Sequence, residues 1–162
     1  MLREVRPDDL PILYEIERDL ASWEERTPAA PGPLTWEAFR EAHRDTGTGF
    51  VITVDDQVVG RCGLMHEDLL ARHAEVGISV AAAARGQGYG TDALRVLAEF
   101  AFVRRNLRRL HLETLADNAA AVAAYRKVGF VEEGRPREHA WVRGAYVDML
   151  RMGLLRSEWT GR

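Results

Sequence analysis

The residues with the clearest chemical potential lie in one glycine-rich segment, Arg85-Gly86-Gln87-Gly88-Tyr89-Gly90-Thr91, between a predicted strand and a predicted helix. Glycine lets the backbone approach a ligand closely and adopt positive φ. The first amides of a helix have no partner within the helix and carry partial positive charge, so they bind anions such as phosphate. Arg85 adds a guanidinium that can hold a phosphate through two hydrogen bonds. The segment therefore predicts a phosphate-binding loop.

Two well-known phosphate loops do not fit this segment. A Walker loop requires a lysine after its last glycine, and that lysine is missing. A dinucleotide fingerprint requires a third glycine where Thr91 stands. The remaining pattern is Arg-x-x-Gly-x-Gly entering a helix, although two glycines would also serve a plain connection between a strand and a helix.

A second group of candidate residues follows further along the chain. Glu113 lies in a predicted strand, 110–115, whose alternation places His111, Glu113 and Leu115 on one face. Asn118 is the predicted N-cap of a helix that runs to Lys127, with Gly129 as its C-cap. Tyr125 lies on that helix and could donate its phenolic proton to a leaving group, or simply pack near Phe130.

The loop and this second group, taken together, resemble the GNAT family, the Gcn5-related N-acetyltransferases. The family pattern is a strand, Arg/Gln-x-x-Gly-x-Gly/Ala, a helix, a strand, Asn, a helix, Tyr and Gly-Phe, and every piece occurs here in order. The similarity is strongest over residues 75–130 and is greatest to ribosomal-protein N-terminal acetyltransferases and small-amine acetyltransferases. It implies direct, sequential transfer of an acetyl group from acetyl-CoA to a primary amine, either a small molecule or a protein N-terminus.

The resemblance also implies roles for particular residues. Acetyl-CoA is expected to place its pyrophosphate on the amides of residues 87–91 and its pantetheine arm between strands 75–80 and 110–115. Tyr125 is expected to protonate the leaving thiolate. Glu113, twelve residues before Tyr125, matches a glutamate that acts as the base in similar ribosomal-protein enzymes, with Glu75 as the second candidate. The expected cofactor-binding residues are Ile78, Ser79, Val80, Arg85, Gly86, Gln87, Gly88, Tyr89, Gly90, Thr91 and Asn118.

Each of these roles has a structural alternative. Asn118 could act only as a helix cap, and Glu113 could be an ordinary hydrogen-bonded strand glutamate. Ser79 lacks the Gly-x-Ser-x-Gly surroundings of a nucleophilic serine. For the whole chain, the alternatives are a non-catalytic acyl-CoA-binding module and a dinucleotide-binding protein.

The elements that must position these residues indicate one α+β domain over residues 1–162. The resemblance implies a mixed, mostly antiparallel sheet of about six or seven strands, flanked by about four helices, with splayed central strands. The sequence predicts a helix opened by Pro7 with Asp8 as its cap, and a helix from Thr35 to about His43. Further predicted elements are a strand at 2–5, a hairpin of 50–54 and 57–64, a strand at 75–80, a helix from 91 to about 106, and a closing hairpin of 131–142 and 145–154.

Composition narrows the possible partners. The chain is 46% hydrophobic and 29% charged with a net charge of -3, which gives no support to nucleic-acid binding. Cys62 is the single cysteine, so no intrachain disulfide forms, and the histidines lack metal-binding spacing. With no signal peptide or bilayer-spanning run, we expect a cytoplasmic protein without membrane contacts. The resemblance suggests a homodimer and an acceptor pocket lined by Trp23, Glu24, Glu25, residues 28–33, Trp36, His139, Trp141 and Tyr146.

Overall fold

The computed structural model describes residues 1–19, 34–43 and 48–161. A 7-stranded sheet forms its centre, in the order β1-β2-β3-β4-β5-β9-β6. Its strands are β1 (Leu2–Glu4), β2 (Thr48–Val54), β3 (Gln57–Asp68), β4 (His73–Val80), β5 (Arg109–Leu115), β9 (Met149–Leu155) and β6 (Val131–Gly134). All neighbouring strands run antiparallel except β4 and β5, which are parallel. The predicted mixed, mostly antiparallel sheet is confirmed.

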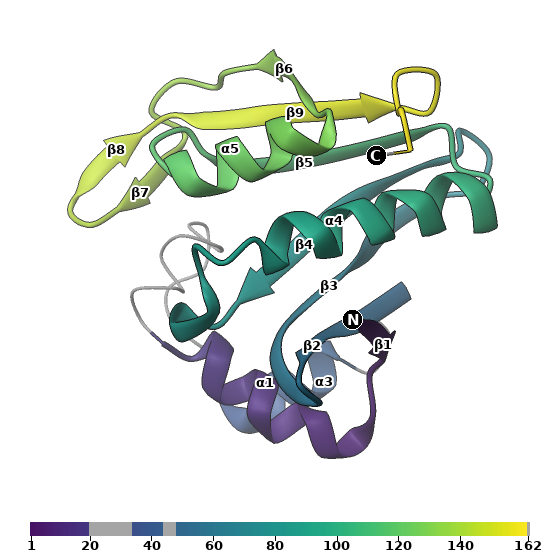
Figure 1. Ribbon diagram of the computed structural model, residues 1–162. Coiled ribbons are helices and arrows are strands. Elements are labelled where there is room, and N and C mark those ends of the chain that lie inside the picture. The colour runs from purple at the N-terminus through teal and green to yellow at the C-terminus, as the bar shows by residue number, and fades with distance from the viewer. Residues whose placement is uncertain (20–33, 44–47, 162) are drawn as a thin grey trace.

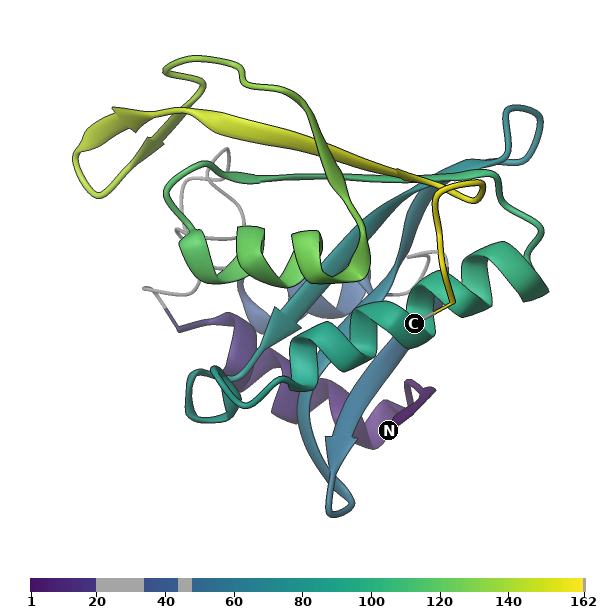
Figure 2. The same cartoon turned by 45° about the horizontal axis from the view of Figure 1, so that its top comes forward.

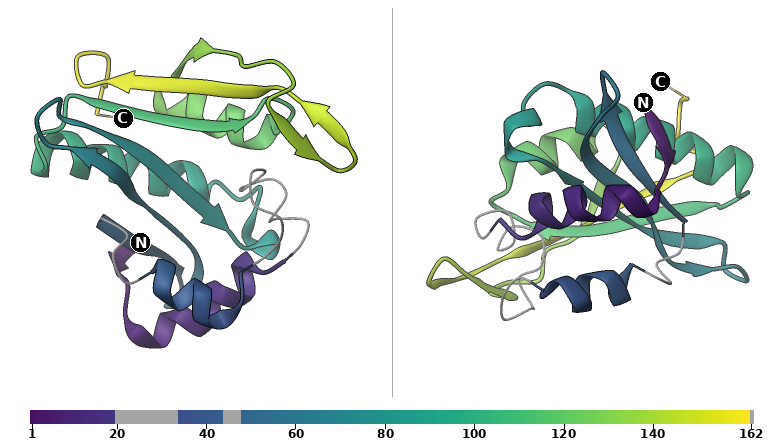
Figure 3. Two further views of the ribbon diagram at one scale, coloured as in Figure 1. Left: turned by 180° about the vertical axis from the view of Figure 1, so that it is seen from behind. Right: turned by 90° about the horizontal axis from the view of Figure 1, so that it is seen from below.

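Helices cover both faces of this sheet. Helices α4 (Tyr89–Glu99) and α5 (Ala119–Val128) lie on one face, which Figures 1 and 2 show towards the viewer. Helices α1 (Leu10–Glu17) and α3 (Trp36–Ala42) lie on the other face and cover only the half that β1–β3 form, as Figure 3 shows. The shorter elements are η1 (Pro7–Asp9), η2 (Ala82–Ala84), a π-helical turn η3 (Phe100–Arg104), and a separate hairpin of β7 (Ala140–Val142) and β8 (Ala145–Val147).

Alternation along the strands produces two apolar cores. Ile52 packs with Leu64, Leu94 and Leu112 in the large core beneath α4 and α5. Its neighbour Val51 points to the opposite face and packs in a smaller core with α1 and α3. Because successive strand side chains point to opposite faces, one strand serves both layers. The sheet is thus fixed on both sides around β2 and β3, whereas the outer face of β5, β9 and β6 lies away from the helices α1 and α3 (Figure 3).

Local signals account for most element boundaries, but the expected cap of the first helix is wrong. Thr35 caps α3 by accepting a hydrogen bond from the amide of Ala38, as predicted. Asp8 is not the cap at the first helix; the carboxylate of Asp9 accepts the amide of Arg6 instead and binds Arg3 at 2.7 and 2.8 Å. The closing hairpin turns at Arg143-Gly144, as expected, because both residues have positive φ.

The closing hairpin is nevertheless not one continuous pair of strands. The chain leaves the main sheet after Gly134 and forms β7 and β8 as a separate ribbon before β9 begins at Met149. Ala140 and Val142 on one side of this ribbon bury against Leu115 and Met149. Packing of this small cluster separates the ribbon from the sheet, and hydrophobic alternation alone does not reveal that separation.

Candidate active site

The two central strands pair over only a short distance. β4 and β5 are joined at His73–Arg109, Ala74–Leu110 and Glu75–His111, and their pairing ends there. Beyond Glu75, β4 pairs with β3 alone, through Val80. The carboxyl ends of the two strands diverge, and the N-termini of α4 and α5 flank the opening (Figure 1). The predicted splay is therefore present, and the backbone of residues 76–80 is available to a ligand on the side that faces β5.

The glycine-rich loop joins β4 to α4 at this opening. Gly86 has φ +74° and Gly88 has φ +89°, a region that side chains rarely adopt. Within the described residues, no hydrogen bond occupies the backbone amides of residues 87–91. These amides, the helix N-terminus behind them and the open space around Gly86 and Gly88 fit a pyrophosphate group.

Two side chains of the loop form hydrogen bonds with the backbone that precedes it. Arg85 Nε donates to the carbonyl of Val80 at 3.0 Å, and Gln87 Nε2 donates to the carbonyl of Ala83 at 3.1 Å. A methyl group added at Gly90 would lie 3.5 Å from Val80 Cγ2, so the loop runs close to the end of β4. The loop is thus built against the end of β4, so the predicted phosphate site and the predicted pantetheine strand are continuous.

Asn118 stands at the start of α5, on the other side of the opening. Its Oδ1 accepts the amide of Ala121 at 3.1 Å, which confirms the N-cap. The cofactor contact remains a prediction.

Substitution of Asn118 can separate the two roles. Asn118→Ala is expected to lower stability by about 1 kcal/mol because the cap is lost. Asn118→Asp is expected to keep the cap and therefore the melting temperature, since aspartate caps as well as asparagine. If the amide also contacts CoA, calorimetric CoA affinity falls in both variants. Unchanged affinity in Asn118→Asp would leave Asn118 with the capping role alone.

Tyr125 projects from α5 into the core beside the opening. Its residue surface is 8% exposed, and its ring packs edge-on against Phe130 with 6.0 Å between ring centroids. Burial raises the pKa of Tyr125 to about 12, so the phenol stays protonated at neutral pH. Its hydroxyl forms no hydrogen bond with the described residues. Tyr125 therefore packs near Phe130 and also keeps a protonated hydroxyl, so the packing role and the proposed role as a proton donor are compatible.

Glu113 lies on the diverging part of β5 and points to the face opposite α4 and α5. Arg151 on β9 is its register partner and donates from Nε to Glu113 Oε1 at 2.6 Å. The Glu113 side chain is 40% exposed. The ion pair orients the carboxylate, and Oε2 makes no hydrogen bond with the described residues. Glu113 is therefore both a hydrogen-bonded strand glutamate and an accessible carboxylate beside the splay.

Ser79 belongs to a buried polar network on this same face. Its hydroxyl donates to Glu17 Oε1 at 3.4 Å, and Arg61 Nε lies 2.6 Å from the same oxygen. The Arg61 guanidinium also contacts Nε2 of His43. Burial first, and then the charge of Arg61, lowers the pKa of His43. The network ties α1 and α3 to β3 and β4 beneath the opening, and the sequence gives no spacing signal for it.

The residues expected to line the acceptor pocket do not all lie together. Trp36 is half-buried and packs against Tyr14 and Phe39 at the edge of the small core. Trp141 and Tyr146 stack edge-on on the outer side of the β7–β8 ribbon, where both are exposed. His139 is exposed just before that ribbon. Trp23, Glu24, Glu25 and residues 28–33 lie outside the described residues.

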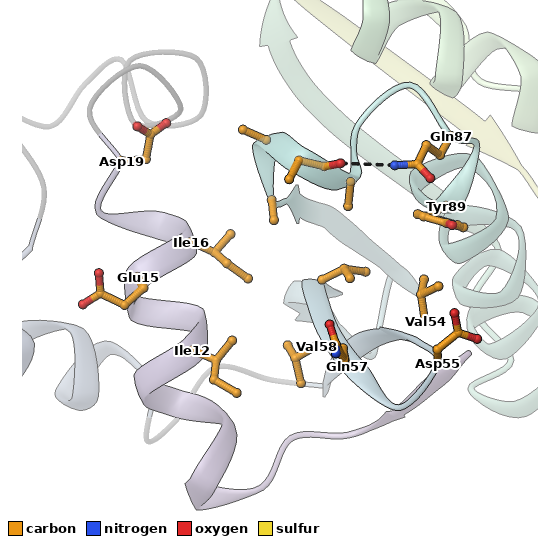
Figure 4. A pocket seen from close by; sticks show the side chains of 15 residues that line it. Ile12, Glu15, Ile16, Asp19, Val54, Asp55, Gln57, Val58, Gln87 and Tyr89 are labelled. Atoms are coloured by element: carbon orange, nitrogen blue, oxygen red, sulfur yellow. Dashed lines mark hydrogen bonds between the residues drawn. The ribbon is translucent and has the colours of Figure 1, made fainter.

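A cavity of about 670 Å³ lies beside the glycine-rich loop, between α1, the tip of the β2–β3 hairpin and η2 (Figure 4). Ile12, Ile16 and Val58 supply apolar walls, and Glu15 and Asp55 are among its polar lining residues. Gln87 and Tyr89 reach it from the loop, but Tyr125, Glu113 and Ser79 do not line it. This cavity flanks the predicted phosphate site and is separate from the splay.

Neither a metal-binding cluster nor a bilayer-spanning helix occurs in the described part of the chain. No group of three or more His, Cys, Asp or Glu side chains there is arranged to hold a metal ion. None of the helices formed by those residues has the length and apolar character needed to span a bilayer. Burial raises the pKa of Cys62 to about 12, so its thiol stays protonated.

The splay between β4 and β5, with a glycine-rich loop at the N-terminus of α4, is the arrangement expected of an acyltransferase that uses acetyl-CoA. The model of the acetyltransferase (GNAT) domain family matches residues 1–131, so the chain belongs to the GNAT family. It is an N-acetyltransferase that uses acetyl-CoA and an amine acceptor.

Several relatives carry more detailed descriptions. The spermidine N(1)-acetyltransferase of Vibrio cholerae is 26% identical over 99% of this chain and 95% of its own length. A putative ribosomal N-acetyltransferase of Bacillus subtilis, YdaF, is 33% identical over 66% of this chain and 58% of its own. The crystal structure of spermidine N-acetyltransferase from Vibrio cholerae with CoA and spermine superposes with a TM-score of 0.87 at 24% identity, over 98% of this chain and 96% of that one.

Proposed function

We propose that the protein acetylates a small aliphatic amine of the polyamine class by direct transfer from acetyl-CoA, with Tyr125 as the acid and Glu113 as the base. The observation that carries this proposal is the opening between β4 and β5, with Tyr125 on one side of the sheet and Glu113 on the other. Relatives named for spermidine match nearly the whole length of the chain, which supports the polyamine acceptor. A protein N-terminus is the second candidate, supported by the ribosomal relative.

The cosubstrate binds mainly to backbone groups, and Arg85 at the start of the loop stays a candidate partner of the pyrophosphate. The amides of residues 87–91 hold the pyrophosphate, and the unpaired edge of Ile78, Ser79 and Val80 holds the pantetheine arm as an added strand would. An amide of that edge donates to the thioester oxygen and stabilises the oxyanion that forms on it. Asn118 contributes from the opposite helix.

The chemical step then follows from the two titratable groups. The acceptor ammonium gives one proton to Glu113 through water, and the free amine attacks the thioester carbon. The C–N bond forms, the tetrahedral intermediate collapses, and the C–S bond breaks. Tyr125 donates its proton to the departing thiolate, and one of the two protons left on the nitrogen restores the phenol while the other stays on the amide. Burial, which keeps Tyr125 protonated, suits this role because only the neutral phenol can donate.

A screen of acceptors by thiol release tests the proposed substrate. Acetyl-CoA is supplied with spermidine, a short diamine, single amino acids or a peptide with a free N-terminus. We expect the largest kcat/KM with spermidine. A preference for the peptide would indicate that the acceptor is a protein N-terminus. Hydrolysis of acetyl-CoA without any acetylated amine would contradict the proposed function.

Thermal unfolding with added ligand tests the cosubstrate site separately. A ligand present at about 100 times its Kd stabilises a protein by roughly 2.7 kcal/mol. At about 2–4 °C per kcal/mol for a domain of this size, the melting temperature should rise by several degrees with acetyl-CoA or CoA. NAD at the same concentration is the control and is expected to produce no shift. A shift with NAD and not with CoA would revive the dinucleotide alternative.

We also propose where the enzyme acts and how its chain is organised. Acetyl-CoA is the required donor, which supports action in the cytoplasm, and the whole of residues 1–162 is proposed to act as one domain. Assembly as a homodimer stays a prediction, which sedimentation equilibrium would check.

A further inference from the structure

A cluster of titratable side chains lies where β4 and β5 begin to separate, on the same face of the sheet as Glu113. His66 Nδ1 lies 2.8 Å from Glu75 Oε2, and Glu75 pairs in register with His111 on β5. The rings of His111 and His73 are 5.3 Å apart. The reaction described above uses none of the three imidazoles, although they lie where β4 and β5 separate.

The cluster extends from the proposed base to solvent. His111 and Glu113 share one face of β5 and are two residues apart, which is roughly 6.6 Å along a strand. A single water molecule between the two side chains would complete the connection. On the other side of His111, Glu75 is partly buried with 30% of its side chain exposed, whereas His66 is 79% exposed. Titratable groups therefore line a path from Glu113 through His111 and Glu75 to His66.

The surroundings of His111 suit a group that gains and loses a proton. Burial is the largest effect and lowers the pKa of His111, and Arg109 on its own strand and the imidazole of His73 on β4 act in the same direction. Glu75 on β4 and Glu133 on β6 oppose them. The β9 residue opposite His111 is Gly153, which brings no side chain, and the Glu133 carboxylate fills that space. A neutral imidazole between two carboxylates can accept a proton and release it.

We propose that His111 is a proton-relay residue, which takes the acceptor's proton from Glu113 and passes it through Glu75 and His66 to solvent. The relay rests on the proposed transfer reaction and explains how its one net proton leaves. Acetyl transfer converts an ammonium and a thioester into an amide, a thiol and a free proton. Tyr125 returns to its starting state, so that free proton is the one which Glu113 must lose before the next turnover.

Buffer rescue of the variant His111→Gln tests the relay, with spermidine as the acceptor. In dilute buffer near neutral pH, kcat is expected to fall by at least about tenfold, because general acid–base steps of this kind contribute about 10²–10⁴-fold. Rising imidazole concentration is expected to restore most of the lost kcat, since a free base can replace the missing ring, while KM for acetyl-CoA stays unchanged. Leu155→Gln is the matched control on the same face, and its kcat should be normal and independent of buffer.

The outcomes separate the relay from the reaction on which it rests. An unchanged kcat in His111→Gln, or a loss that no buffer restores, would overturn the relay while wild-type turnover upholds the reaction. If the wild type acetylates no amine, titration of the imidazole resonances by NMR decides. Glu75→Gln is then expected to lower the pKa of His111, because the neighbouring carboxylate raises it. No change in that pKa would overturn the relay independently of turnover.

Discussion

Replacing Tyr125 with phenylalanine is expected to lower kcat by about 10²–10⁴-fold, the range typical of a lost general acid. The change removes a single oxygen from a ring that is 8% exposed and packed on Phe130, so the core keeps its shape. The thiolate must then leave without a proton, or take one from water. Steady-state thiol release with wild type and variant measures the effect.

The same variant also distinguishes an enzyme from a binding module. CoA affinity, measured by calorimetry, should stay within about threefold of the wild type, since the proposed phosphate and pantetheine contacts lie on other elements. Equal turnover by Tyr125→Phe and the wild type would remove Tyr125 from the mechanism. A lower melting temperature together with weak CoA binding would instead identify Tyr125 as a core residue.

Replacing Gly88 with alanine is expected to weaken CoA binding by at least about tenfold, with a smaller loss of stability. Gly88 has φ +89° at the N-cap of α4, and a side chain in that region costs roughly 1–2 kcal/mol. We expect the loop to relieve this strain by turning its amides away from the proposed pyrophosphate position, and each 1.4 kcal/mol changes Kd by about tenfold. Calorimetry with CoA, which needs no acceptor, measures the effect.

Gly134→Ala provides the control for this substitution. Gly134 ends β6, has no positive φ, and an added methyl group there would meet nothing within 4 Å. Its CoA affinity should equal that of the wild type. If Gly88→Ala also binds CoA normally, then the amides of the loop do not hold the pyrophosphate.

The sequence predicts the cosubstrate half of the site more completely than the acceptor half. The loop, Asn118, Tyr125 and Gly129 form a continuous motif, because their positions depend on one strand–helix–strand–helix segment. Local signals such as glycine at positive φ and a capping asparagine are sufficient there. The pairing of Glu113 with Arg151 joins residues far apart in sequence. No local pattern encodes such a contact.

Long-range packing also explains the sequence predictions that were wrong. Asp8 is the expected cap of the first helix, but the carboxylate of Asp9 binds Arg3 of β1 and accepts the amide of Arg6 instead. The network of Glu17, Arg61 and His43 brings together two helices and a strand. Its members have no common spacing, so only the folded chain reveals them.

The short pairing between β4 and β5 has a mechanical consequence. Among the described strands, three residue pairs form the ladder that joins the two halves of the sheet. A pantetheine arm lying along β4 would extend the hydrogen-bonded connection across the gap, so the donor would act as a removable strand that stiffens the protein between its halves. Amide hydrogen exchange in residues 76–80 and 112–115 should therefore slow together when CoA binds. The enzyme would become rigid only while it carries its donor, and product release would loosen it for the next cycle.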